Sequence, residues 1–159
     1  MERLKKYHTI PFLNTDTTDN PTWARVGKST IFDLTVNAQT EENDFIESEM
    51  TETDVTSYKP ELPQELQTNK GDEAFDYIYD KFYNLPTGEE VREELLIVFA
   101  GNNGTDEAPS FNAWKTNSTL ILEHLDTVAQ KIYFKFAINT IERGTVTITD
   151  KKPVFVANK

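Results

Sequence analysis

The residues most suggestive of chemistry are 25–30, which contain Gly27, Lys28 and Ser29, the closing residue types of a phosphate-binding P-loop. Such a loop cradles phosphate with backbone N–H groups at the start of a helix. The pattern requires another glycine five positions before Gly27, where this chain has Thr22. The residues after Ser29 alternate like a strand. The segment therefore predicts no nucleotide site.

The other reactive side chains form no recognisable catalytic or metal-binding pattern. The chain has no cysteine, and its two histidines, His8 and His124, lack the spacing of a zinc site or a Ser-His-Asp triad. We predict no catalytic residue, no cofactor and no metal ion. Carboxylates are abundant enough that a glycosidase-like pair stays open, although nothing in the sequence selects one.

The densest charge lies in residues 41–54, which hold seven acidic residues and no basic one. The spacing does not match an EF-hand calcium loop, because the glycine of the turn and the closing glutamate are missing. Apolar residues interrupt the acids, and prolines follow at positions 60 and 63. We predict a projecting hairpin or loop over 39–65 whose apolar residues pack against another surface. Its apolar candidates for self-assembly are Phe45, Ile46, Met50, Val55 and Tyr58, and its acidic candidates are Glu41, Glu42, Asp44, Glu47 and Glu49.

One amphipathic helix is predicted over residues 72–85. Phe75, Ile78, Phe82 and Leu85 recur at helical spacing and form its apolar face. Asp72 is suited to the first turn, and the proline at position 86 ends the helix. A helix with one apolar face needs a sheet to cover.

The remaining patterns predict strands. Ile132, Phe134, Phe136 and Ile138 alternate with more polar residues, as in a half-buried antiparallel strand. Residues 95–100 are apolar throughout, so both faces of that strand should be covered, one of them by the helix. Further strands are expected at 28–37 and 145–149, with turns at 126–127 and 142–144.

These elements predict a mainly β protein: an antiparallel β-sandwich or barrel with one flanking helix at about 72–85 and a projecting hairpin at about 39–65. Residues 1–27 are expected to form an N-terminal arm, and residues 28–159 a single domain. No run of residues is long and apolar enough to span a membrane, and the start of the chain lacks the apolar core of a secretory signal.

The net charge of −11 is distributed unevenly, because residues 41–110 hold 19 acidic and four basic residues. An acidic centre argues against a surface that grips nucleic acid, which needs clustered lysine and arginine. The excess of acidic residues is compatible with an ordinary solvent-exposed surface. It is also compatible with self-association, in which an acidic patch on one copy meets a basic patch on the next.

The order of several short motifs resembles the tail tube (major tail) protein of long-tailed bacteriophages. The resemblance covers about residues 23–157, and its order carries it more than any single motif. The matching motifs are residues 23–27, the strand at 30–37, residues 39–41, Phe45 with Ile46, Tyr58 with the proline-rich exit, and Gly71 with Asp72 at the start of the helix.

That resemblance implies a structural virion protein that assembles into stacked hexameric rings. The rings form a hollow tube through which double-stranded DNA reaches the host without specific binding. The implied partners are other copies of the chain, the tape measure protein and the tail-end proteins, with no membrane involved. Assembly would take place in the host bacterial cytoplasm, and the protein would reside in the virion. The long element at 39–65 would contact other subunits, and its acids would line the lumen or an interface.

Two other functions remain open from the sequence. A monomeric β-sandwich binding module, for example for carbohydrate, would expose Trp23 and Trp114 as stacking platforms. A hydrolase would use a pair of acids. Core or interface positions are the favoured interpretation for both tryptophans.

Overall fold

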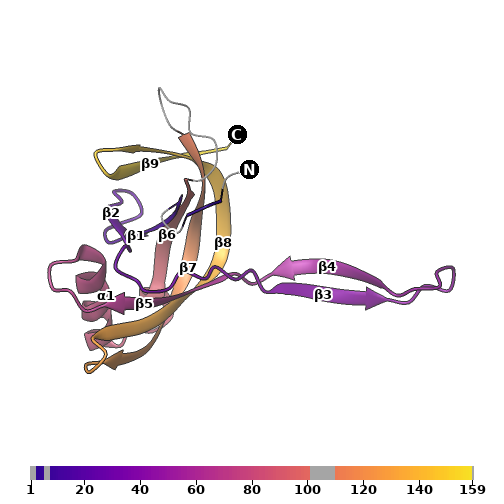
Figure 1. Ribbon diagram of the computed structural model, residues 1–159, viewed down its shortest axis with the longest axis horizontal. Helices are drawn as coiled ribbons and strands as arrows, with labels where there is room; N and C mark the ends of the chain where they lie inside the picture. The colour runs from indigo at the N-terminus through magenta and orange to yellow at the C-terminus, as the bar shows by residue number, and fades with distance from the viewer. Residues whose placement is uncertain (1–2, 6–7, 101–109, 159) are drawn as a thin grey trace.

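The computed structural model describes residues 3–5, 8–100 and 110–158. It is mainly β, with one α-helix and a curved antiparallel sheet that nearly closes into a barrel, as the sequence predicts (Figure 1). In order along the chain, the elements of the body are β1 (Thr9–Asn14), β2 (Trp23–Arg25), β5 (Glu61–Gln67), α1 (Glu73–Asn84), the 3₁₀ turn η2 (Gly88–Val91), β6 (Arg92–Phe99), β7 (Ser110–Asp126), β8 (Lys131–Thr149) and β9 (Lys152–Ala157). None of the described helices is long and apolar enough to cross a bilayer.

The strand β8 organises the sheet. The order is β2-β1-β6-β7-β8-β5, and β9 also pairs with β8. Along its length β8 pairs with β7, from Asp126↔Lys131 to Ser110↔Thr147. On its other side, the first part of β8 pairs with β5 and the last part with β9. One long strand therefore holds three neighbours.

The helix α1 forms close to its predicted limits, between Asp72 at the N-cap and Leu85 at the C-cap. Phe75 and Ile78 are buried and Phe82 is partly buried against the core, which confirms the predicted apolar face. Leu85 does not belong to that face. Its φ of 47° takes the chain out of the helix, and its side chain is exposed.

The core lies on both faces of β6, as its continuous apolar sequence predicts. Leu95 and Ile97 face the helix side, where Phe75 and Ile78 join one apolar cluster. Leu96 and Val98 face the opposite way into a second cluster. All four side chains of β6 are fully buried. Burying each of these side chains is worth roughly 1.5 to 3 kcal/mol, so β6 contributes to both clusters.

The strand predicted over 28–37 is wrong. The chain pairs with β5 only through isolated bridges, Ser29↔Leu66 and Thr35↔Glu61. Between them the backbone leaves the sheet, and Phe32 is exposed. The segment runs along the outer edge of β5, where Leu34 packs against the core but Phe32 and Val36 are exposed.

Two further expectations need correction. Residues 142–144 are not a turn, because β8 runs through them without a break. Gly144 allows β9 to lie close to β8, because an added Cβ would meet the carbonyl oxygen of Val156 and lie 2.6 Å from the Phe155 ring. The N-terminal arm over 1–27 is also wrong for the residues of β1 and β2, since both strands are part of the main sheet.

The strands β3 (Ala38–Asn43) and β4 (Glu52–Tyr58) form a separate two-stranded sheet that projects far from the body (Figure 1). The projecting hairpin is therefore confirmed as a structural feature. Its predicted end at residue 65 is too late, because 61–65 belong to β5 in the main sheet. Pro63 is accommodated there opposite Lys135.

The side chain of Gln64 is buried in β5 between Leu62 and Leu66, and neither atom of its amide makes a hydrogen bond. We expect Gln64→Leu to raise the free energy of unfolding by about 1 to 3 kcal/mol, because it removes an unpaired buried polar group. Urea denaturation measures the change. Gln67→Leu, at the exposed end of the same strand, is the control and should change little. A less stable Gln64→Leu variant would contradict the prediction.

Candidate functional site

The hairpin formed by β3, β4 and the loop between them, residues 38–58, presents its apolar side chains to solvent. Ile46 is fully exposed at the tip, and Met50 is 78% exposed. Phe45, Val55 and Tyr58 are also exposed. The five predicted acidic candidates, Glu41, Glu42, Asp44, Glu47 and Glu49, are exposed on the same element. The structure thus brings both sets of candidates together on one projection.

Specific hydrogen bonds hold the hairpin in shape. At the tip, Ser48 N–H donates to the Phe45 carbonyl at 3.1 Å, and Ser48 Oγ donates to the Met50 carbonyl at 2.8 Å. Along the strands, Asn43 Nδ2 donates to Asp54 Oδ2 at 3.1 Å. The pairing is irregular between Gln39 and Thr40, which marks a bulge. The hairpin is therefore an ordered element with defined side-chain positions.

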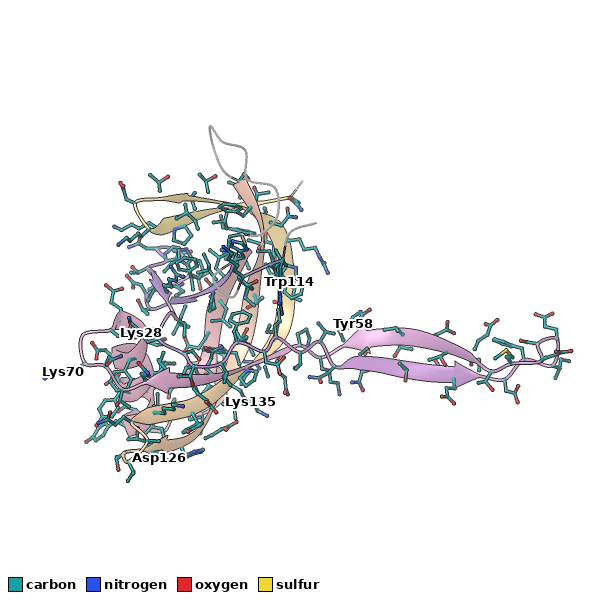
Figure 2. The ribbon with its side chains drawn as sticks, in the orientation of Figure 1. Lys28, Tyr58, Lys70, Trp114, Asp126 and Lys135 are labelled. Atoms are coloured by element: carbon teal, nitrogen blue, oxygen red, sulfur yellow. The ribbon has the colours of Figure 1, made fainter. Side chains whose placement is uncertain are left out.

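The base of the hairpin is fixed to the body by Asn37, whose φ of 44° turns the chain outward. Its Nδ2 donates to the Lys59 carbonyl at 2.9 Å. Lys59 N–H in turn donates to the Val36 carbonyl at 3.0 Å. Asparagine tolerates the left-handed region better than most residues. Figure 2 shows Tyr58 where the hairpin leaves the body, with side chains standing out along both sides of the projection.

The physical chemistry of this element favours a partner. A two-stranded hairpin is marginally stable alone in water and needs further strands or a packing surface. None of the seven strand residues of β4 is covered. The seven acidic residues of 41–54 also repel one another. A partner with apolar and basic groups would relieve both problems.

A buried polar cluster joins α1 to β6, and sequence reasoning missed it. Tyr77 OH donates to Glu93 Oε2 at 2.7 Å, and Lys81 Nζ lies 3.5 Å from Glu93 Oε1. Burial raises the pKa of the Glu93 carboxyl, and the hydrogen bond from Tyr77 and the positive charge of Lys81 offset this only in part. Burial and Glu93 together raise the pKa of Tyr77. The only sequence signal was a carboxylate just before an apolar run.

This cluster is best interpreted as a structural link. Glu93 is 4% exposed, so a substrate has no access to its carboxyl group. The charged neighbour Lys81 also donates to the Glu90 carbonyl at 3.0 Å, which ties the helix to the turn before β6. The cluster therefore holds α1 against the sheet.

We expect the stability of the protein to depend on the protonation of Glu93. The pKa of this carboxyl is raised above 4.5 in the folded state, so its contribution is fully present below about pH 4.5 and is lost as the pH rises through the folded value. The free energy of unfolding should therefore fall relative to that of Glu93→Gln between pH 4.5 and 7. Urea denaturation across this range measures it.

The control for that experiment is Glu89→Gln, which removes one exposed carboxylate from η2. If the wild-type protein and Glu93→Gln respond to pH in parallel, Glu93 does not titrate with folding. A curve for Glu89→Gln that matches the curve for Glu93→Gln would show only a general effect of charge.

The remaining candidates do not assemble into a site. No helix follows Lys28, and Ser29 Oγ instead donates to the Ile31 carbonyl at 2.9 Å. His124 stacks on Tyr133 with 4.1 Å between ring centroids. Within the described residues, no group of three or more metal-binding side chains of the histidine, cysteine, aspartate and glutamate types is found.

The tryptophans are not exposed platforms. Trp114 packs edge-on against Phe99 with 5.1 Å between centroids, and Trp23 is partly buried against the second apolar cluster. This arrangement fits the interpretation of both as core residues. It gives no support to a sugar-binding module.

The comparisons with known proteins add no family assignment. No protein-family model and no curated protein matches the sequence. The hairpin is therefore the feature from which a function must be argued.

Proposed function

We propose that this protein is a structural subunit that assembles with copies of itself, as a tail tube protein of a long-tailed bacteriophage does. The observation that carries the proposal is the projecting hairpin, whose apolar side chains are exposed in the single chain. An element of this kind gains stability by joining the sheet or packing face of a neighbour. The motif order that resembles tail tube proteins makes this assembly class the favoured one.

A head-to-tail contact of this type has a simple geometric consequence. The hairpin of one copy uses a surface that differs from the one it contacts on the next, so the interface is heterologous. Such contacts form a ring if the rotation closes and a filament if it does not. Stacked hexameric rings would combine a closing contact around the ring with a non-closing contact along the tube.

A tube of this kind also has a defined location and defined partners. The tube would belong to the virion, form in the host bacterial cytoplasm, and meet the tape measure and tail-end proteins at its ends. Double-stranded DNA would pass along the lumen without specific binding. An acidic wall suits that passage, because a basic wall would bind phosphate and slow it.

We expect the purified protein to form rings or tubes at high concentration. Negative-stain microscopy of concentrated protein, together with native mass spectrometry over a dilution series, tests this. Monomer at every concentration and salt level would overturn the proposal. Monomer whose tryptophan fluorescence is quenched by sugars would favour the binding module in its place.

A further inference from the structure

The strand β9 presents the second unusual surface of the molecule. Its exposed residues Val154 and Val156 are 59% and 60% accessible, whereas Phe155 between them faces the second apolar cluster. Among the described strands, only β8 pairs with β9. The other edge of β9 therefore lies open beside two exposed valines.

One hydrogen bond shows which backbone N–H and C=O groups of β9 face β8 and which face away from it. Asn158 N–H donates to the Arg143 carbonyl at 3.0 Å, and the register continues through Ala157↔Gly144. Because hydrogen-bonded and outward-pointing residues alternate in an antiparallel pair, Phe155 and Ala157 direct their N–H and C=O groups away from β8. Pro153 also directs its backbone away from β8, but it has no N–H to donate. The free edge thus offers donors and acceptors to one more strand.

The other edges of the described body fit a hairpin less well. β2 has three residues, whereas β3 and β9 have six each and β4 has seven. β5 is already engaged on its outer side, where Thr30 N–H donates to the Glu65 carbonyl and Thr35 N–H to the Glu61 carbonyl. Only β9 combines sufficient length with an open edge among the strands of the body that the structure describes.

Charge favours the same pairing. The exposed charged residues around β9 include three bases, Arg143, Lys151 and Lys152, and two acids, Glu142 and Asp150. The hairpin carries seven acids within residues 41–54 and no base. Two hairpins would repel each other, as would a hairpin and the acidic first turn of α1. A basic, valine-bearing edge meets the requirements of the hairpin.

We propose that β9 is the acceptor for the hairpin of a second copy of this chain, which adds a strand to the main sheet of its neighbour. The acid-rich hairpin supplies backbone pairing and apolar side chains, Val154 and Val156 receive the apolar contact, and Lys151 and Lys152 neutralise the carboxylates. This inference rests on the proposed self-assembly and names its acceptor surface.

Hydrogen exchange followed by mass spectrometry tests the backbone pairing. Peptides that cover 152–158 are compared between dilute monomer and assembled protein. The outward amides of Phe155 and Ala157 should exchange about tenfold or more slowly after assembly. Assembly without protection in these peptides overturns the acceptor site and leaves the proposed function intact. Absence of assembly overturns both.

Charge reversal tests the complementarity. Lys151→Glu with Lys152→Glu should raise the concentration needed for assembly about tenfold or more. Adding Glu41→Lys and Glu42→Lys to the same chain should restore it. The matched control is Lys28→Glu with Lys70→Glu, two exposed lysines at the α1 end of the molecule, away from the hairpin (Figure 2). Equal loss in the control, or no rescue in a folded chain, contradicts the proposed pairing.

Discussion

Changing Phe45 and Ile46 to aspartate is expected to abolish assembly while the single chain stays folded. Both side chains are exposed on the hairpin, so neither contributes to the core. Substitutions of this kind usually change the free energy of unfolding by no more than about 0.5 kcal/mol. In an assembly, each large apolar contact is worth roughly 1.5 to 3 kcal/mol, and a buried unpaired charge adds a further cost at every subunit.

Light scattering and circular dichroism melting, measured on the same samples, separate the two effects. The control is Val128→Asp, which places a charge at an exposed apolar residue in the turn between β7 and β8. It should leave both folding and assembly unchanged. Loss of the fold in the double variant would mean that the hairpin tip belongs to the core. Normal assembly by the double variant would exclude the tip from the interface.

A second large effect is expected from Gly144→Val. A Cβ at this position would meet the carbonyl oxygen of Val156, which cannot move unless β9 moves. Overpacking of this kind typically costs about 1 to 3 kcal/mol, and contact with backbone places the change at the upper end, about 3 kcal/mol. Urea denaturation measures the loss. Because β9 is displaced, assembly should be lost as well.

The matched control is Gly27→Val. An added Cβ at Gly27 would have the side chain of Arg25 as its nearest neighbour, at 3.6 Å, which is ordinary contact. We therefore expect a change within about 0.5 kcal/mol for this exposed position. If both glycine substitutions cost the same, the loss at Gly144 reflects the general effect of a β-branched residue and not the approach of β9.

Apolar periodicity was sufficient to predict the elements that form the core. The alternation from Ile132 to Ile138, the continuous apolar run of β6 and the helix face of Phe75 and Ile78 all describe side chains whose burial decides the structure. The projecting hairpin was also predictable, because an acid-rich segment interrupted by apolar residues suits neither a core strand nor an ordinary loop.

Other features depend on neighbours that the sequence does not reveal. Gly144 was predicted to form a turn, because glycine favours turns, but its small size is needed for the close approach of β9. The pattern at 28–37 alternates, yet β5 holds it only near its ends. Sequence reasoning did not identify the proposed acceptor surface on β9. Its signal was two alternating valines beside Lys151 and Lys152.

The sheet topology also has a consequence for folding kinetics. β7, β8 and β9 are consecutive in sequence and form a meander with short connections, so this part can form quickly. β1 must wait, because Thr9 pairs with Phe99. At ribosomal rates of about 5 to 20 residues per second, β1 can pair early with β2 but lacks its partner β6 for roughly 5 to 20 seconds during synthesis. The acidic hairpin emerges within that interval, before β6 is available to pair with β1.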